Sequence, residues 1–404
     1  MGRYHEPILR STRVTPLPPR FLLLLVALSV SAYTPPPLMR RDVNVQPAAI
    51  CKTCHLGIAE EWERSSHSKA DGTRNRLWGR MYLYSLKETR GATMLACAPC
   101  HETVSFVTQD FENIREVSME GVTCYFCHAI EGPGDPKGIP PYTLDLAKMQ
   151  GTIRSPQPTP AHGSAHSTYV KSSDYCGGCH EYKNQHGVRI GETLSEWKAS
   201  KYAKTGVTCQ SCHMPGAPGR NSHLAPVRPR VADHSFSHEA LEAARPNAAT
   251  LKLRAERART GDSLRVFATA TNAGWGHSLP TGNDQKIAIL RVRVLAESGA
   301  VVWENDPFTE WGLSVFGLIL ADELGQWPAE TWNATNVVSD QRIKAGQNAR
   351  VQYDVPLDGA TGPFRVEARL LLRRARPATI EAYGLNEAIY GVERQLAEAA
   401  LTAP

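Results

Sequence analysis

The chain lacks long apolar segments and has no isolated cysteine. Only 7% of its 404 residues are aromatic, and one apolar run alone, residues 21–32, exceeds ten residues. That run is too short to cross a bilayer core of about 30 Å as a helix, which excludes a polytopic membrane protein. The net charge of +5 is small and not clustered, so nothing indicates nucleic-acid binding. With 21% charged residues, 31 glycines and 28 prolines, the chain is neither disordered nor a fibrous repeat.

The first 32 residues have the layout of a secretory signal peptide. Residues 1–20 carry four arginines and one acid, the apolar run follows, and Val30-Ser31-Ala32 supplies small residues for cleavage. A Pro-rich linker over residues 33–49 comes next. We therefore expect a periplasmic or extracellular protein. The alternative is an uncleaved N-terminus that associates with a membrane.

Every cysteine belongs to a Cys-x-x-Cys-His unit, the pattern of covalent c-type haem attachment. Two thiols three positions apart reach the two vinyl carbons of one porphyrin, and the next residue places a neutral imidazole under the iron. Disulfides or zinc would use paired cysteines too, but neither explains a histidine after all five pairs. The sequence thus predicts five covalent haem c groups, held by Cys51, Cys54, Cys97, Cys100, Cys124, Cys127, Cys176, Cys179, Cys209 and Cys212, with His55, His101, His128, His180 and His213 as proximal ligands.

The chain has more than enough histidines for a second axial ligand on every iron. Methionine is the usual rival ligand, but no methionine outside the first 32 residues has an evident ligand context. A lone histidine is more often a surface or core residue than a ligand, so at least three of the candidates must have other roles. The eight candidates are His67, His162, His166, His186, His223, His234, His238 and His277.

An internal repeat helps to choose among them. The segment E-W-E-R-S-S-H at 61–67 aligns with E-W-K-A-S-K-Y at 196–202, and G-V-T-C recurs at 121–124 and 206–209. On one helix, Trp62 and His67 would point about 140° apart, so the indole could pack while the imidazole faces a haem. His67 is therefore our first distal candidate. Tyr202, at the matching position, is either a packing residue or a polar group beside a haem.

These segments, together with C-Q-S-C-H-M-P at 209–215 and G-H-S-L-P-T-G at 276–282, resemble the multihaem cytochrome c family. That family includes the tetrahaem electron carriers of ammonia oxidisers and the subunits of extracellular cytochrome filaments. The resemblance extends over residues 50–290, with a weaker echo to residue 375. It implies that His277 reaches back as a distal ligand, and that the segments of His162 and His234 supply ligands too. His166 or His238 is expected as the fifth, whereas His186 and His223 are expected to be non-ligands.

The fold class we expect is α+β. Residues 50–245 have little period-2 patterning and form a loop-and-helix pentahaem cytochrome domain. Alternating apolar and polar residues then predict a β-sandwich-like domain over residues 246–375, followed by a C-terminal helix and tail over 376–404, the helix capped by Asn386. The Trp-rich segment 311–330 is interpreted as core or as an inter-domain contact. The predicted strands are 251–257, 263–271, 286–295, 301–304, 349–355 and 364–372.

The main hypothesis is an exported pentahaem c-type cytochrome that relays electrons between redox protein partners, with most irons bound by two histidines. Under this hypothesis we expect an electron-transfer protein more than an enzyme, and we assign no catalytic residue. One alternative is an oxidoreductase with one open haem, acting on a nitrogen or sulfur oxyanion or on hydroxylamine. Another is a homo-oligomer or filament in which a histidine such as His238 or His277 binds the haem of the next protomer.

Overall fold

The computed structural model describes residues 43–135, 139–157, 159–309 and 313–404, and residues 39–404 belong to one compact unit. The predicted signal peptide and most of the Pro-rich linker lie outside the described residues. Within the described ranges, none of the helices has both the length and the apolar character needed to cross a membrane.

The first part of the described chain is built from short helices, and each Cys-x-x-Cys-His motif lies on or next to one. Polar caps start several of them. The side chains of Thr123 and Ser172 accept hydrogen bonds from the first turns of their helices, and Thr208 forms a capping box with Ser211. The helices are α1 (Ala48–Lys52), α2 (Leu56–Arg64), α3 (Arg76–Glu88), α4 (Thr93–His101), α5 (Thr103–Thr108), α6 (Cys124–Ala129), α7 (Ser173–His180), α8 (Thr193–Ala199), α9 (Lys201–Lys204), α10 (Cys209–His213) and α11 (His238–Ala244), with 3-10 turns η1 (His67–Lys69), η2 (Glu116–Met119) and η3 (Tyr169–Lys171).

Four short two-stranded sheets lie between these helices, which the expected loop-and-helix pattern did not include. Strands of three to five residues are too short for an alternating pattern to be detected in the sequence. Three of the sheets are antiparallel and the sheet of β3 and β4 is parallel. The pairs are β1 (Ile130–Pro133) with β2 (Tyr142–Leu144), β3 (Lys148–Gly151) with β4 (Gly163–His166), β5 (Glu181–Lys183) with β6 (Arg189–Glu192), and β7 (Gly216–Gly219) with β8 (Arg228–Ala232).

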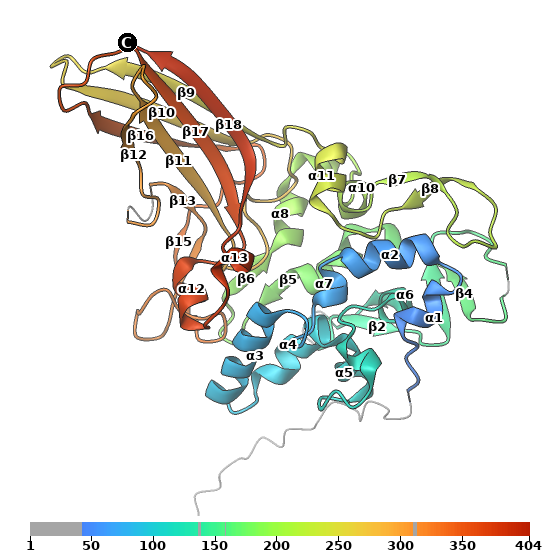
Figure 1. The fold of residues 1–404 in the computed structure, drawn as a ribbon. Helices are drawn as coiled ribbons and strands as arrows, with labels where there is room; N and C mark the ends of the chain where they lie inside the picture. Colours follow the sequence, from blue (N-terminus) through green and yellow to red (C-terminus); the bar gives the residue numbers. More distant parts are fainter. Residues whose placement is uncertain (1–42, 136–138, 158, 310–312) are drawn as a thin grey trace, which may run out of the picture. The chain divides into compact units, whose positions relative to one another are not determined.

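The second part is a sandwich of two antiparallel sheets, as predicted (Figure 1). One sheet has the order β16-β10-β9, and the other has the order β12-β11-β17-β18, with β13 beside β11. Every second side chain of β10, β11 and β17 points into a shared core that includes Leu264, Leu290 and Val366, all fully buried. All six predicted strands are confirmed: β9 (Ala249–Arg257), β10 (Ser263–Asn272), β11 (Ile287–Leu295), β12 (Val301–Glu304), β16 (Asn348–Pro356) and β17 (Phe364–Arg373).

The predicted C-terminal helix is wrong. Asn386 does cap a helix, by accepting a hydrogen bond from the Ala388 N–H, but that helix, α13 (Glu387–Tyr390), has only four residues. It follows α12 (Pro377–Ala382), and the chain then forms the eleven-residue strand β18 (Glu393–Ala403) along the free edge of β17. Alanine and glutamate favour a helix locally, but pairing with β17 satisfies the backbone of a whole strand and closes the sheet.

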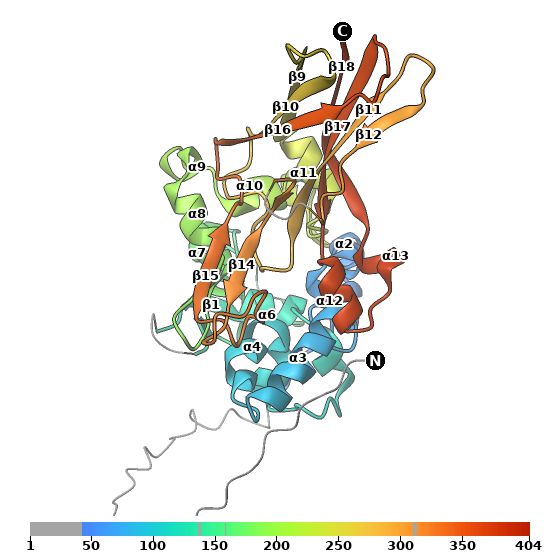
Figure 2. The same ribbon diagram turned by 90° about the vertical axis from the view of Figure 1, so that its left-hand side faces the viewer.

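The Trp-rich segment contributes to the core, in agreement with its interpretation. It supplies β13 (Val315–Phe316) and β14 (Leu318–Ala321), and β14 pairs with β15 (Asn336–Asp340) (Figure 2). Leu318 and Leu320 pack against Val188 and Ile190, at the β5–β6 hairpin that follows the fourth motif. This second apolar cluster joins the sandwich to the helical part.

We predict that the sandwich core contributes a large share of the stability. Replacing the fully buried Leu290 by alanine leaves a cavity and should lower the free energy of unfolding by about 2–5 kcal/mol. Val301→Ala, at a residue on β12 that is 53% exposed, is the control and should change it by about 0.5 kcal/mol or less. Chemical denaturation monitored by circular dichroism measures both, and equal losses would contradict the assignment of this core.

Candidate functional site

Eight histidines form four facing pairs, and each pair joins one motif histidine to one distant histidine. The ring centres are 6.1–6.4 Å apart in every pair. The pairs are His55 with His162, His180 with His67, His128 with His234, and His213 with His277. The four distant histidines are the four that the sequence ranked as distal candidates.

This separation suits one iron between the two rings. An imidazole nitrogen lies about 2 Å from a bound metal ion, and its ring centre about 1 Å further, so two imidazoles on opposite sides of one iron have centres about 6 Å apart. Direct packing would bring the rings closer together, and hydrogen bonding between them would need a nitrogen–nitrogen contact. The residues present therefore fit a haem at each pair, held by the two cysteines of the motif.

Backbone carbonyls orient many of these rings. The Nδ1 atoms of His55, His128, His162, His234 and His277 each face a backbone oxygen, with a distance of 2.7 Å from His128 to Gln150 and 2.9 Å from His234 to Ala232. A hydrogen bond from Nδ1 leaves Nε2 free as an iron ligand and fixes the orientation of the ring.

Burial also keeps the rings neutral, which is the form that binds a metal. It lowers the pKa of His67, His128 and His213 to about 4 and that of His180 to about 3, because a charged imidazole is poorly solvated there. These histidines are therefore uncharged near neutral pH.

His67 reaches its position by a different route from the one expected. Helix α2 ends at Arg64, because Ser65 is extended with ψ 164°, and His67 begins the separate turn η1. Trp62 and His67 are therefore not on one helix, and the predicted angle between them does not apply. The edge of the Phe236 ring meets His67 with the ring centres 4.4 Å apart, which helps to hold the imidazole beside His180.

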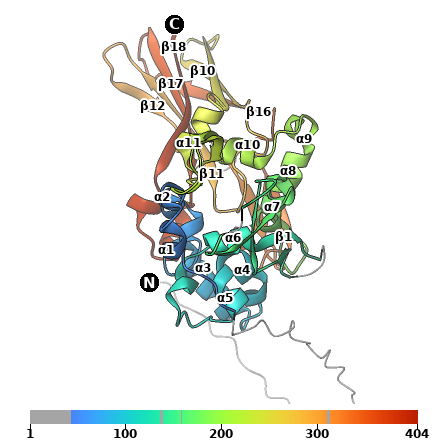
Figure 3. The same ribbon diagram turned by 90° about the vertical axis from the view of Figure 1, so that its right-hand side faces the viewer.

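His101, in the second motif, has no such partner. Among the described residues no other histidine ring faces it, and neither His166 nor His238 fills this role. His166 ends β4 opposite Gly151, next to the Gln150 carbonyl that holds His128. His238 begins α11, which packs against α10 of the fifth motif (Figure 3). Both candidates are thus tied by their own elements to other motifs.

The two expected non-ligands also lie outside the pairs. His223 hydrogen-bonds to the Cys54 carbonyl through its backbone N–H, at 3.0 Å, and His186 sits in the turn of the β5–β6 hairpin. Tyr202 is a packing residue, whose hydroxyl donates to the Gly274 carbonyl at 2.7 Å beside the segment that carries His277.

Thiols of different motifs lie against one another and connect the five motifs. All ten cysteines are free thiols, and within the described ranges no cluster of three or more histidines, cysteines or acids is suited to bind a metal ion directly. The contacts run from the first motif to the third, from the third to the fourth, and from the fourth to both the second and the fifth. The side chains of Cys51 and Cys124, of Cys100 and Cys179, and of Cys176 and Cys209 interact directly, and the third motif reaches the fourth through Cys127 Sγ, which lies 2.8 Å from the hydroxyl oxygen of Tyr175, just before Cys176.

The two Glu-Trp repeats make the same contacts at two different sites. The Trp62 indole donates to the Val122 carbonyl at 2.8 Å, and the Trp197 indole donates to the Val207 carbonyl at 2.9 Å. Each valine lies two residues before the first cysteine of a G-V-T-C motif. Gly121, just before Val122, has φ +67° and passes so close to His67 that a Cβ would lie 2.5 Å from the His67 carbonyl oxygen. Glycine is therefore required there.

The glutamates of the repeats hold the opposite side of the same two sites. Glu61 accepts a hydrogen bond from the His234 N–H at 2.8 Å, and Glu196 accepts one from the Ser278 N–H, next to His277, at 3.0 Å. Since His234 faces His128 and His277 faces His213, each Glu-Trp dipeptide contacts both the motif and the opposing histidine segment of one pair.

Arg342 ties the second of these sites to the sandwich. Its guanidinium is nearly buried and forms ion pairs with Glu196 at 2.8 Å, Glu192 at 3.2 Å and Asp340 at 2.7 Å. The paired arginine holds the pKa of the Asp340 carboxyl below its usual range. Sequence analysis missed this role, because the three acids are dispersed along the chain.

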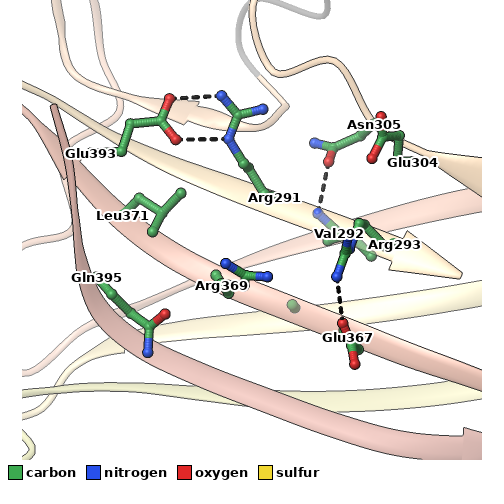
Figure 4. Close-up of a pocket in the computed structure, with 11 residues that line it drawn as sticks. Arg291, Val292, Arg293, Glu304, Asn305, Glu367, Arg369, Leu371, Glu393 and Gln395 are labelled. Atoms are coloured by element: carbon green, nitrogen blue, oxygen red, sulfur yellow. Dashed lines mark hydrogen bonds and ion pairs between the residues drawn. The ribbon is translucent and has the colours of Figure 1, made fainter. Parts of the chain in front are cut away.

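A shallow groove on the outer face of β11, β17 and β18 contains none of the motif residues (Figure 4). Its charged side chains pair mainly with one another: Arg291 binds Glu393 at 2.6 Å and Arg293 binds Glu367 at 2.9 Å. The groove therefore belongs to the surface of the sandwich and not to the histidine pairs.

Comparison with known proteins finds a family model that matches part of the chain and a solved structure with a similar fold. Residues 50–129 match the model of the family "Cytochrome c554 and c-prime". A search of curated proteins finds no match. The crystal structure of a penta-heme cytochrome c552 from Thermochromatium tepidum has a TM-score of 0.72 at 22% identity, over 89% of this chain and 99% of that one. Two further structures have TM-scores too low to support an argument. The structural-genomics target SoR45 has a TM-score of 0.19 at 11% identity, over 39% of this chain and 88% of that one. The C-terminal domain of wzt has a TM-score of 0.20 at 6% identity, over 39% of this chain and 74% of that one.

We predict that Glu61 controls the His128–His234 pair. Glu61→Leu removes the acceptor of the His234 N–H, so the loop can move and part of one haem should change from low-spin to high-spin. The neighbouring Glu60→Leu is the matched control, because Glu60 is exposed and its side chain makes no hydrogen bond to the described residues. Low-temperature electron paramagnetic resonance of the two ferric proteins measures the change, and identical spectra would contradict this role.

Proposed function

We propose that the chain is a multihaem c-type cytochrome, which carries five haems and relays electrons between redox protein partners. The observation that supports this most is the set of four facing histidine pairs, at 6.1–6.4 Å, on motifs whose thiols lie against one another. Haem iron supplies one-electron chemistry when it is bound. The chain supplies neutral imidazoles in fixed orientations and a buried setting for them.

The thiol contacts indicate the order of the path. The sulfur of each cysteine marks an edge of its porphyrin, so motifs with touching sulfurs hold neighbouring haems. The contacts of Cys51 with Cys124 and of Cys176 with Cys209, together with the 2.8 Å contact of Cys127 with Tyr175 beside the fourth motif, support a chain of motifs one, three, four and five. Cys100 against Cys179 adds the second motif as a branch from the fourth.

Histidines on both sides of four irons suit a relay rather than catalysis. Two strong axial ligands leave no position for a substrate and change little between the two redox states. Export to the periplasm or beyond is part of this proposal and is supported by the composition of residues 1–32. The partners in this proposal are redox proteins, one that donates electrons to the chain and one that accepts them.

A second candidate function is supported by His101 alone. With no histidine opposite it in the described chain, the haem of the second motif would have an open or exchangeable position, as in an oxidoreductase acting on a small nitrogen or sulfur compound. The branch from the fourth motif would let the relay exchange electrons with that position. Of the residues nearby, Tyr82 and Tyr182 lie close enough to Cys97 to interact with it electrostatically.

We predict a ferric protein with four low-spin haems and one high-spin haem. Integrated low-temperature electron paramagnetic resonance measures this ratio, and a reductive titration should show that all five haems are reduced within a biological range of potentials. Haems that cannot be reduced in that range would rule out the relay. Five low-spin haems would leave the relay intact but remove the open position. Nitrite and hydroxylamine turnover assays then test the second candidate directly.

A further inference from the structure

His101 differs from the other motif histidines in what covers its ring. The indole of Trp78 stacks on the imidazole with the ring centres 3.7 Å apart and the planes only 15° from parallel. No other histidine of the motifs or of the facing pairs, within the described residues, has an aromatic ring stacked so closely. Among the motif histidines, His101 is the one with no opposing imidazole in the described chain, and it is also the one whose ring face is covered by an indole.

The indole is held in this position by the residue that follows His101. Trp78 Nε1 donates to Glu102 Oε1 at 3.0 Å, and the Gly72 N–H donates to the same oxygen at 2.8 Å. Glu102 is buried, so rotation of the indole would leave a carboxylate oxygen with one fewer donor in a poorly solvated place.

The surrounding backbone leaves little freedom for the indole to move. The side chain of Asn75 caps α3, because its Oδ1 accepts a hydrogen bond from the backbone N–H of Trp78 at 3.2 Å. The residue after Trp78 is Gly79, whose backbone lies against that of Gly72. A Cβ added at Gly79 would be 2.2 Å from the Gly72 carbonyl oxygen.

The stacked indole does not occupy the place where an iron would bind His101. A metal ion bound to imidazole lies in the plane of the ring, along the direction of the nitrogen lone pair. Trp78 lies above the face of that ring, so it contacts the ligand and not the metal. It can therefore restrict tilting and dissociation of His101 while the opposite axial position exchanges ligands.

We propose that Trp78, fixed by Glu102, is a positioning residue that keeps His101 bound to iron when a strong ligand occupies the opposite axial position. This inference rests on the proposed function, because it requires a haem on the second motif with an exchangeable position. At the four other motifs the opposing histidine performs the corresponding task. At His101 the stacked indole takes its place.

The test uses nitric oxide as a probe on the fully reduced holoprotein. Nitric oxide weakens the bond on the opposite side of the iron, and the electron paramagnetic resonance signal shows splitting from one nitrogen or from two, according to whether the histidine has left. The wild-type protein should show splitting from two nitrogens. Trp78→Leu, which removes both the stack and the donor, should shift most of the signal to splitting from one.

Two further variants make the result specific. Trp78→Phe keeps a flat ring without the indole donor, so it should give a mixture of the two signals. Trp303→Phe, in the sandwich, is the control and should match the wild-type protein. Haem content is measured in each variant, and if Trp78→Leu does not retain its haems the comparison rests on Trp78→Phe, which must differ from Trp303→Phe.

The outcomes separate this inference from the proposed function. Two-nitrogen splitting in the wild type and in both Trp78 variants would overturn the role of Trp78 and leave the open position intact. A wild-type protein that binds no nitric oxide would overturn the open position, and with it the basis for this role, while the relay through the four facing pairs would stand.

Discussion

Two imidazoles facing each other across the width of one metal ion are the constraint on which this structure depends. Four times, the chain brings a histidine from a distant segment to about 6 Å from a motif histidine, and in three of these pairs the two are more than a hundred residues apart in sequence, as with His128 and His234. Such rings gain little from touching each other, since a gap separates them. Their arrangement makes physical sense when the energy of two metal–ligand bonds is included.

The supports around two of these pairs are hydrogen bonds from side chain to backbone. A Glu-Trp dipeptide occurs twice, and each copy holds the motif with its indole and the opposing histidine segment with its carboxylate. In the second copy the opposing segment belongs to the sandwich, and Arg342 binds the same glutamate. His277 thus lies on the segment between β10 and β11 of the sandwich, and Arg342 binds the glutamate that holds this segment.

The second motif departs from this plan in a consistent way. It has no opposing histidine among the residues that the structure describes, it joins the others at the fourth motif, and its histidine carries a stacked indole. A relay that consists only of paired histidines would not need a branch or a supported single ligand. These three features together distinguish the second motif from the other four.

The sequence alone determined the attachment chemistry, because a Cys-x-x-Cys-His unit is local and its residues act together within one turn of helix. It also predicted the six sandwich strands, whose alternating side chains report which face is buried, and it ranked His67, His162, His234 and His277 as distal candidates. The partner of each histidine could not be read in this way, since facing pairs join segments that are far apart in the chain. The isolation of His101, the stack with Trp78 and the ion pairs of Arg342 arise for the same reason. Strand β18 was decided by the free edge of β17 against the helical preference of its own residues, because the energy of pairing with a sheet exists only after the sheet has formed.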